Sequence, residues 1–159
     1  MTKSVAVVTG AAGDIGRAIA KRLADDHDVI LLVDLDLAAA EKAARMLGPA
    51  ERFVAFGCDV TSDESVAAMA RAAAEHGTVR TLVNNAGAAR AVSLHGTSPD
   101  DWRADNALNL EAPFLCFRAV EDQLKATQGS VINIASVNGM HVFGHPAYSA
   151  AKAGMLHFT

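Results

Sequence analysis

Short apolar runs alternate along the chain with longer segments in which apolar residues recur every three or four positions. A short apolar run that ends near glycine, aspartate or asparagine is typical of a strand buried on both faces of a sheet. The pattern predicts five strands, at residues 4–9, 29–33, 52–58, 81–84 and 131–134. Helical spacing predicts five helices, at residues 15–26, 37–47, 61–76, 99–125 and from 147 to the end of the chain.

The predicted helices carry start and stop signals. Gly48 and Pro49 end the second helix, and Pro99 stands at the first turn of the fourth. The four residues from Thr61 to Glu64 are typical of a capping box that opens the third helix, with Thr61 as the cap.

Strands that alternate with helices in this order predict an α/β fold with a parallel sheet, right-handed crossovers and helices on both faces. Because the glycine-rich turn follows the first strand, we expect a Rossmann-like doubly wound sheet with strand order 3-2-1-4-5. Such sheets bind ligands at the carboxyl ends of the strands, where the order reverses. No linker or repeat divides residues 1–159, so a single domain is expected.

Composition narrows the class of protein. Of the 159 residues, 51% are hydrophobic and 20% are charged, which supplies a buried core and shows no signature of disorder. The net charge of −4 offers no basic stripe for nucleic acid or an anionic membrane, and no apolar stretch has the length of a spanning helix or a signal peptide. Cys58 and Cys116 are isolated, so a reducing, cytoplasmic setting is the simplest interpretation.

The first predicted strand leads through a glycine-rich turn into the first helix. Such a turn can bind a diphosphate, because it presents backbone N–H groups and a helix N-terminus with no side chain in the way. Glycine turns also occur for structural reasons alone, but here a strand precedes the turn, a helix follows it and an acid ends the second strand. The residues expected to hold the diphosphate are Gly10, Gly13, Asp14, Ile15 and Gly16.

The acid is Asp34. A carboxylate there can accept hydrogen bonds from both hydroxyls of the adenosine ribose and would repel a 2′-phosphate, so the predicted cofactor is NAD rather than NADP. Asp59 and Val60 end the third strand, where Asp59 can accept from an adenine amino group and Val60 can donate through its backbone. The alternatives are a solvated turn residue for Asp34 and a helix-capping role for Asp59.

Three stretches together form a family pattern: the glycine turn, Asn-Asn-Ala-Gly at residues 84–87 and Tyr-Ser-Ala-Ala-Lys at residues 148–152. Their joint order and spacing resemble the short-chain dehydrogenase/reductase family over residues 5–159. The resemblance implies that Asn85, Ala86 and Gly87 steady the central sheet and line the adenosine side of the cofactor. It also implies a catalytic set of Asn109, Ser136, Tyr148 and Lys152.

Tyr148 and Lys152 are four residues apart on a predicted helix, so both side chains reach one face, although such a pair alone is usually a surface pair. A phenol with a pKa of about 10 is a poor base at neutral pH, and a neighbouring ammonium favours the phenolate. The resemblance implies that Tyr148 exchanges a proton with the substrate and that Lys152 also binds the nicotinamide ribose. It implies that Ser136 holds the substrate oxygen and that Asn109 holds a water linking Lys152 to solvent. Asn106 competes with Asn109, which we prefer because the residues after it match the family's Asn-Leu…Phe pattern.

The histidines His141, His145 and His157 lack a metal-binding spacing, so no metal is predicted. His141, Val142 and Phe143 lie in the loop expected to border the substrate, and shaping a pocket and forming a plain loop remain equally open for them.

The fourth predicted helix presents Leu108, Ala112 and Leu115, a pattern found more often in a core than at an interface. In the family, however, this helix and the helix of Tyr148 commonly build a subunit contact. A homodimer or homotetramer is therefore expected.

Two local departures from the family pattern concern the site. Asp14 stands where glycine is usual; aspartate tolerates a left-handed backbone, and we expect its carboxylate to point to solvent or cap the helix and to weaken cofactor binding. The interval from Ser136 to Tyr148 is about one residue shorter than usual, which a loop absorbs.

The third departure is at the end of the chain, which stops inside the helix of Tyr148, where the family continues with a sixth and a seventh strand. We therefore expect a domain that is incomplete at its C-terminus, with the fifth strand (Val131, Ile132 and Ile134) as an exposed apolar edge. A partner copy that covers the edge by strand or domain exchange is the alternative.

The resemblance implies NAD-dependent oxidation of a secondary alcohol or reduction of a ketone, on a small-molecule substrate, with Tyr148 as acid and base. One alternative is a non-catalytic nucleotide-binding fragment or assembly module, which the missing C-terminal part favours. Another is a 3-oxoacyl-carrier-protein reductase, because such reductases share these motifs. The NAD preference predicted from Asp34 argues against that biosynthetic subclass.

Overall fold

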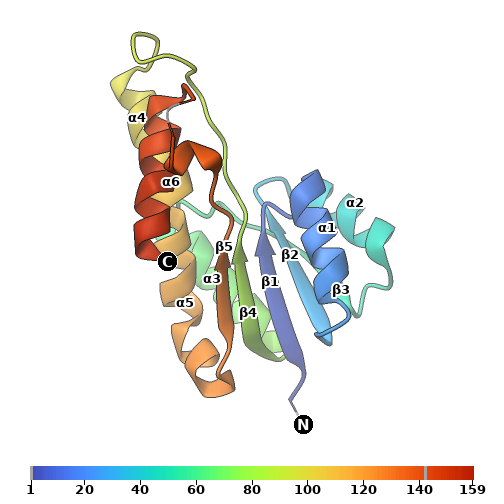
Figure 1. Ribbon diagram of the computed structural model, residues 1–159. Helices are drawn as coiled ribbons and strands as arrows, with labels where there is room; N and C mark the ends of the chain where they lie inside the picture. Colours follow the sequence, from blue (N-terminus) through green and yellow to red (C-terminus); the bar gives the residue numbers. More distant parts are fainter. Residues whose placement is uncertain (1, 142) are drawn as a thin grey trace.

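The computed structural model describes residues 2–141 and 143–159. Within these residues, five parallel strands form one sheet in the order β3-β2-β1-β4-β5, with helices on both faces (Figure 1). The strands are β1 (Ser4–Thr9), β2 (Val29–Asp34), β3 (Phe53–Gly57), β4 (Thr78–Asn84) and β5 (Ser130–Asn133). The helices are α1 (Asp14–Leu23), α2 (Leu37–Leu47), α3 (Asp63–His76), α4 (Pro99–Asn106), α5 (Ala112–Thr127) and α6 (Pro146–Phe158). The α/β class, the doubly wound topology and the strand order predicted from the sequence are confirmed.

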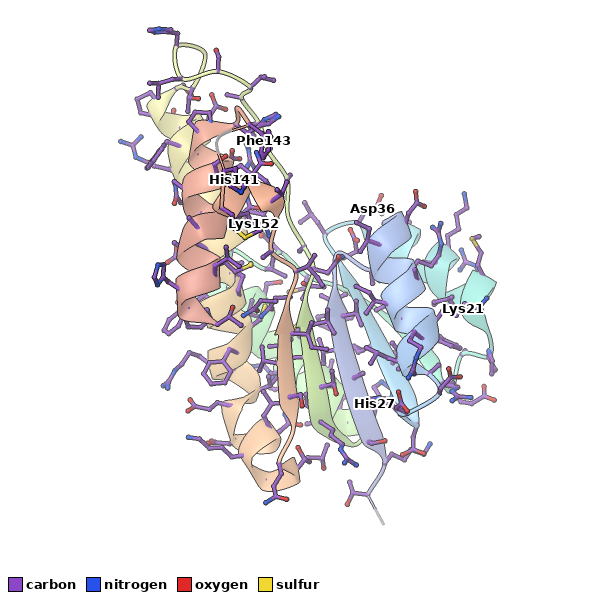
Figure 2. The ribbon with its side chains drawn as sticks, in the orientation of Figure 1. Lys21, His27, Asp36, His141, Phe143 and Lys152 are labelled. Carbon is purple, nitrogen blue, oxygen red and sulfur yellow. The ribbon has the colours of Figure 1, made fainter. Side chains whose placement is uncertain are left out.

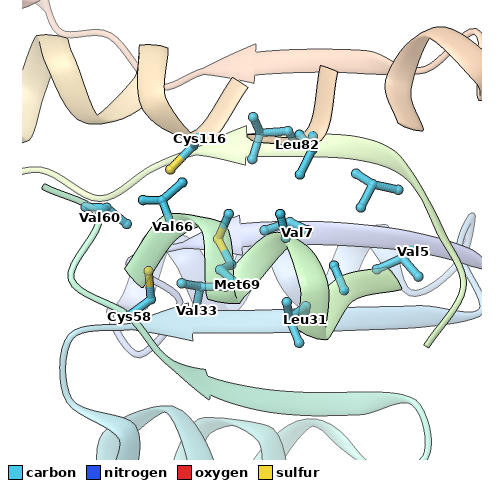
Figure 3. Packing of buried hydrophobic residues seen from close by; sticks show 14 of the residues in the cluster. Val5, Val7, Leu31, Val33, Cys58, Val60, Val66, Met69, Leu82 and Cys116 are labelled. Atoms are coloured by element: carbon cyan, nitrogen blue, oxygen red, sulfur yellow. The ribbon is translucent and has the colours of Figure 1, made fainter. Parts of the chain in front are cut away.

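The fully apolar strand runs follow from two-sided burial. Along β1, Val5 and Val7 face the core formed with α3 and α5, whereas Ala6 and Val8 face the core formed with α1 and α2. Figure 3 shows the first of these cores, in which Met69 of α3 lies among the side chains of the central strands. Since both faces are covered, the sequence of β1 shows no polar alternation.

Two predicted elements differ from the structure in instructive ways. β4 begins at Thr78 rather than at residue 81, because Thr78 and Val79 pair with Ser4 and Val5 of β1 even though this stretch is partly polar. The single helix predicted at residues 99–125 is divided into α4 and α5 by a π-helical turn, η1 (Ala107–Glu111). The other predicted bounds shift only at element ends, where helices and strands fray.

The predicted cap of α3 is wrong by one position. Ser62 is the N-cap, and its hydroxyl accepts a hydrogen bond from the Ser65 N–H over 3.4 Å. Thr61 instead donates both its N–H and its hydroxyl to Asp59 Oδ1, over 2.9 and 2.7 Å. Thr61, Ser62 and Asp63 are all residue types that cap helices, and their order in the sequence does not tell at which of them the helix begins. At α4, by contrast, the predicted first-turn proline is confirmed, with Ser98 as the cap.

β5 is the edge strand next to β4. Ile132 is 44% exposed, which confirms the apolar edge expected there, and Val131 and Ile134 are half-buried. A wholly apolar groove of about 500 Å³ lies on the α1 side of the sheet beside this edge. It is lined by Ile15, Ala18, Ile19, Leu23 and the aliphatic stem of Arg22, and by Val83, Ile132 and Ile134. α6 packs mainly on the 3-10 turn at Val137–Gly139, on α4 and on η1 rather than on the sheet. Among the described helices, none combines the length and apolar character needed to cross a bilayer.

Candidate active site

The turn between β1 and α1 requires glycine at two positions. Gly10 has a φ of +63°, and a Cβ added there would lie 2.9 Å from the Cα of Ala86. A Cβ on Gly16 would lie 2.8 Å from the Cα of Ala11. A side chain at either position would collide with backbone, so the turn keeps its main chain bare, as a phosphate-binding turn needs.

Asp34 lies beside this turn, at the end of β2. Its Oδ2 accepts a hydrogen bond from the Ala12 N–H over 3.0 Å, and its Oδ1 accepts one from the Asp36 N–H over 3.3 Å. The residue is half-buried. Asp34 is therefore anchored by the backbone of the glycine turn and is not a freely solvated turn residue.

A cleft of about 330 Å³ opens at the carboxyl ends of the strands. Most of its lining was predicted from the sequence as cofactor-binding: Gly10, Gly13, Asp34, Asp59, Val60, Ala86 and Gly87. Leu35, Cys58 and Leu108 also line it and were missed. Each of the three is the chain neighbour of a predicted site residue, and that adjacency is the signal that could have identified them.

Other predicted cofactor residues lie outside this cleft. Ile15 is 64% exposed, and Asp14 is the first residue of α1, with its side chain 94% exposed. Asp14 forms an ion pair of 2.6 Å with Arg17, whose guanidinium also donates to the Ala12 carbonyl over 3.4 Å. Among the described residues Asp14 is not one of those with positive φ, so the turn does not need the left-handed backbone that aspartate tolerates. Its carboxylate points to solvent, and Gly13 occupies the cap position.

Asp59 has a local role as well as a place in the cleft. The hydrogen bonds from the Thr61 hydroxyl and N–H lower the pKa of Asp59 below its ordinary value. Asp59 does not cap α3, because Ser62 does. Its proposed bond to an adenine stays a prediction.

The Asn-Asn-Ala-Gly segment ties β4 to β1. The Thr9 hydroxyl accepts from the N–H groups of Asn85 and Ala86, each over 3.0 Å. The Asn85 side chain donates to the carbonyls of Thr9 and Gly10, over 2.9 and 3.1 Å. The side chain of Asn85 thus fixes the main chain of the glycine turn by hydrogen bonds. Ala86 and Gly87 line the cleft.

Lys152 is 3% exposed although it is cationic. Its Nζ donates to the Ile134 carbonyl over 2.7 Å and lies 5.7 Å from the centre of the Tyr148 ring. Burial lowers the pKa of Lys152 from 10.5 to about 8. In Figure 2, Lys152 lies near the carboxyl ends of the strands, with the loop that carries His141 and Phe143 above it.

Asn109 lies inside the π-helical turn and is fully buried. Its Nδ2 donates to the carbonyls of Ala88 and Asp105, each over 2.8 Å, and its Oδ1 has no hydrogen-bond partner among the described residues. A Cβ on Gly87 would lie 2.8 Å from Asn109 Oδ1 and 3.6 Å from Lys152 Nζ. Asn109, Lys152 and the cleft residue Gly87 therefore meet at one point. Asn106, the competing candidate, is bonded instead to the Trp102 carbonyl.

Ser136 follows β5 and accepts a hydrogen bond from the Asn138 N–H over 3.2 Å, which starts the 3-10 turn η2 (Val137–Gly139). The Asn138 side chain donates to the Ser149 hydroxyl over 3.3 Å, and Ser149 donates to the Gly144 carbonyl over 2.8 Å. These bonds tie the Ser136 loop to α6 at Ser149, the residue directly after Tyr148. Asn138 was missed, because a single Asn in a predicted loop gives no signal of its partners.

Hydrogen bonds of His145 hold the loop before α6. His145 has a φ of 50°; its N–H donates to the Val92 carbonyl over 2.8 Å, and its Nδ1 lies 3.1 Å from the Ala91 carbonyl oxygen. The rings of His141 and Phe143 are exposed and pack edge to face at 6.1 Å, while Val142 lies outside the described residues.

Comparison with known proteins gives a consistent result. The family model described as short chain dehydrogenase matches residues 4–159. The chain is 42% identical over 158 residues to D-threitol dehydrogenase of Mycolicibacterium smegmatis, covering 96% of this chain and 60% of that protein. It is 36% identical over 166 residues to 3-oxoacyl-[acyl-carrier-protein] reductase of Synechocystis, covering 100% of this chain and 66% of that protein.

A solved structure has the same fold. The crystal structure of an oxidoreductase of the short-chain dehydrogenase/reductase family from Burkholderia thailandensis matches with a TM-score of 0.88 and 36% identity, over 99% of this chain and 61% of that chain. The chain thus spans 60% of the first relative's length and 61% of this structure's. The extent of these matches shows that the chain belongs to the short-chain dehydrogenase/reductase family.

Proposed function

We propose that the chain is the nucleotide-binding and catalytic part of an NAD-dependent oxidoreductase that interconverts a secondary alcohol and a ketone. The observation that carries the proposal is the place of Gly87, which lines the cleft beside Asp34 and also lies against Asn109 and Lys152. Predicted cofactor residues of the cleft thus lie next to two of the predicted catalytic residues, which supports one continuous site.

The cleft fits a dinucleotide. The bare backbone at Gly10 and Gly13 suits a diphosphate, and the half-buried carboxylate of Asp34 suits two ribose hydroxyls. No Lys or Arg among the described residues forms an ion pair with Asp34, so its charge stays available to repel a 2′-phosphate. When bound, the nicotinamide ring would supply the hydride acceptor or donor.

The side chains around Lys152 supply the proton chemistry. Lys152 has three N–H donors: one is donated to the Ile134 carbonyl over 2.7 Å, and a second makes a weak contact of 3.8 Å with the Met155 sulfur. The third, and the second when a better acceptor than sulfur is present, would serve the nicotinamide ribose and a water. Tyr148 lies beside Lys152, whose Nζ is 5.7 Å from the centre of its ring, and its hydroxyl would take the proton from an alcohol or return it to a ketone. Ser136, held at the end of β5, would donate to the substrate oxygen.

Asn109 fits the proton relay proposed for it. A buried carbonyl oxygen without a partner is costly, and a bridging water is the usual way in which such an atom is satisfied. A water between Asn109 Oδ1 and Lys152 Nζ would satisfy both groups. This is the arrangement that a proton path from Lys152 to solvent requires.

Substitution of Tyr148 by Phe tests the proposal, because it removes the hydroxyl and keeps the ring. In the protein that carries this chain, turnover of secondary alcohols with NAD should fall by roughly 10²–10⁴-fold, the usual worth of a positioned acid and base. Binding of NADH should be nearly unchanged, since the cleft beside Asp34 remains. Turnover that persists in Tyr148→Phe would remove Tyr148 from the mechanism.

A 3-oxoacyl-carrier-protein reductase is the second candidate, supported by the 36% identity to the Synechocystis reductase. Asp34 argues against this candidate, because its carboxylate disfavours NADP, the cofactor expected of a biosynthetic reductase.

We further propose a homo-oligomer, which exposed apolar side chains on α5 and α6 support. Two buried, unpaired cysteines support a reducing, cytoplasmic setting.

A further inference from the structure

A buried carboxylate lies one helical turn before Asn109, on Asp105. Asp105, in the last turn of α4, is 1% exposed, and its Oδ1 lies 2.7 Å from Arg90 Nη1. Its Oδ2 also accepts a hydrogen bond from the Arg90 backbone N–H over 3.3 Å. The pair Asp100–Arg103 on the same helix has a similar length, 2.7 Å, but both of its side chains are exposed. A carboxylate leaves water only when it is well paired, so the burial of Asp105 calls for a role.

Asp105 touches Asn109 through its main chain. The Asn109 amide has two N–H groups; one is donated to the Asp105 carbonyl and the other to the Ala88 carbonyl. Ala88 is two residues before Arg90, so the Asp105 side chain holds the segment that supplies the second acceptor. With both N–H groups held, Asn109 Oδ1 has one fixed direction, toward Gly87 and Lys152.

The same segment is also held from the opposite side. The carbonyls of Ala91 and Val92 accept hydrogen bonds from His145, the residue that precedes α6. Residues 88–92 therefore span the space between the turn of Asn109 and the helix of Lys152. A shift of this segment would move Asn109 and Lys152 relative to each other.

We propose that Asp105 is a positioning residue: by pairing with Arg90 it fixes residues 88–92 and so directs Asn109 Oδ1 toward Lys152 Nζ. The inference rests on the roles proposed above for Asn109 and Lys152. Its test therefore includes one measurement that does not depend on turnover.

The first measurement follows the Asn109 side-chain amide by NMR in the protein that carries this chain. In Asp105→Ala the two N–H groups should lose protection from hydrogen exchange and their resonances should move. In Asp100→Ala, the matched exposed pair, both should stay as in the wild type. An unchanged Asn109 amide in a folded Asp105→Ala protein would overturn the proposal, whether or not the wild type turns over substrate.

The second measurement is steady-state kinetics. Asp105→Ala should lower kcat by roughly 10–100-fold, as expected for a small misplacement of a catalytic group, with the KM for NAD within about threefold of the wild type. Asp105→Asn, which keeps an acceptor oxygen for Arg90, should recover most of the rate. A kcat unchanged in Asp105→Ala would contradict the positioning role.

A double variant separates positioning from stability. Replacing the pair by apolar residues, Asp105→Leu with Arg90→Met, removes the buried charge and should restore the thermal stability that Asp105→Ala loses. If Asp105 positions Asn109, kcat stays low in the stable double variant. If kcat recovers together with stability, the ion pair is only structural and the proposal is wrong. A protein without turnover in the wild type would instead refute the proposed function and leave the amide measurement to decide on Asp105.

Discussion

The carboxylate of Asp34 accepts a hydrogen bond from the backbone N–H of Ala12, with 3.0 Å between the two atoms. The acid at the end of β2 is thereby tied to the glycine turn after β1. Its charge is expected to set cofactor choice, and its hydrogen bond is expected to hold the turn. These two contributions can be separated by substitution.

Asp34→Asn keeps an acceptor for Ala12 and removes the charge, whereas Asp34→Ala removes both. We expect the preference for NADH over NADPH to fall by roughly 10–100-fold in both variants, since hydrogen bonds to a charged group are lost. Only Asp34→Ala should also lower the Tm. Titration with both cofactors and thermal unfolding test this, with Asp36→Asn as control, because Asp36 caps α2 outside the cleft and Asn caps equally well. An unaltered preference in Asp34→Asn would show that the carboxylate does not select the cofactor.

Asp14 brings a negative charge to the N-terminus of α1, where a diphosphate is proposed to bind. Asp14→Asn should tighten NADH binding by about two- to fivefold at low ionic strength, and salt should reduce the gain. Asp100→Asn is the matched control, because Asp100 is equally exposed and also pairs with an arginine three residues later. Equal effects of the two substitutions would mean that the charge of Asp14 does not act on the diphosphate.

Burial of Lys152 makes stability depend on pH. The pKa of Lys152 is lowered from 10.5 to about 8, so between these values the unfolded chain binds more protons than the folded one. The contribution of Lys152 to the free energy of unfolding should therefore rise with pH across that window and stay constant below about pH 8. Denaturant unfolding of the wild type and of Lys152→Met at several pH values isolates this contribution as a difference.

At neutral pH, Lys152→Met should be more stable than the wild type by roughly 1–2 kcal/mol, because it removes a desolvated charge and loses one hydrogen bond. The gain should disappear toward pH 10. A difference between the two proteins that is independent of pH would contradict the lowered pKa.

Leu108, Ala112 and Leu115 follow the core pattern that the sequence favours for them, and other side chains form the exposed apolar surface. Ala112 is buried, and Leu108 and Leu115 pack against the core. Phe114 and Phe158 are 45% and 41% exposed and pack edge to face at 6.2 Å. These two rings join α5 to α6 on an outer surface.

If copies of the chain associate through α5 and α6, Phe114→Glu should give a smaller species in sedimentation than the wild type. Trp102→Glu is the control, since Trp102 is 44% exposed on α4. A wild type that sediments as a monomer, or a Phe114→Glu protein of unchanged size, would exclude this surface as the contact.

The sequence predicted the fold, and the residues that line the cleft, because their signals are local. Buried strands read as apolar runs, glycine marks the turn after β1, and Asp34, Asp59 and Gly87 each end or follow a strand at the same edge of the sheet. Parallel topology then brings them together without further information.

What the sequence could not predict depends on contacts between distant segments. The π-helical turn that divides α4 from α5 contains Asn109, whose side chain bonds to Asp105 and to Ala88 from a distant loop. The charge of Asp105, on a helix rich in acids, gives no sign of its burial, because burial is made possible by Arg90 from another loop. Helix α1 begins at Asp14, one residue earlier than predicted, with Gly13 as its cap.

The most direct test of the account is titration of the wild-type chain, shown to be folded by circular dichroism, with NADH and then with NADPH under identical conditions. The account predicts saturable binding of NADH that is clearly tighter than that of NADPH. Binding of NADPH as tight as that of NADH would contradict the role of Asp34, and a folded chain that binds neither would contradict the proposed cofactor site.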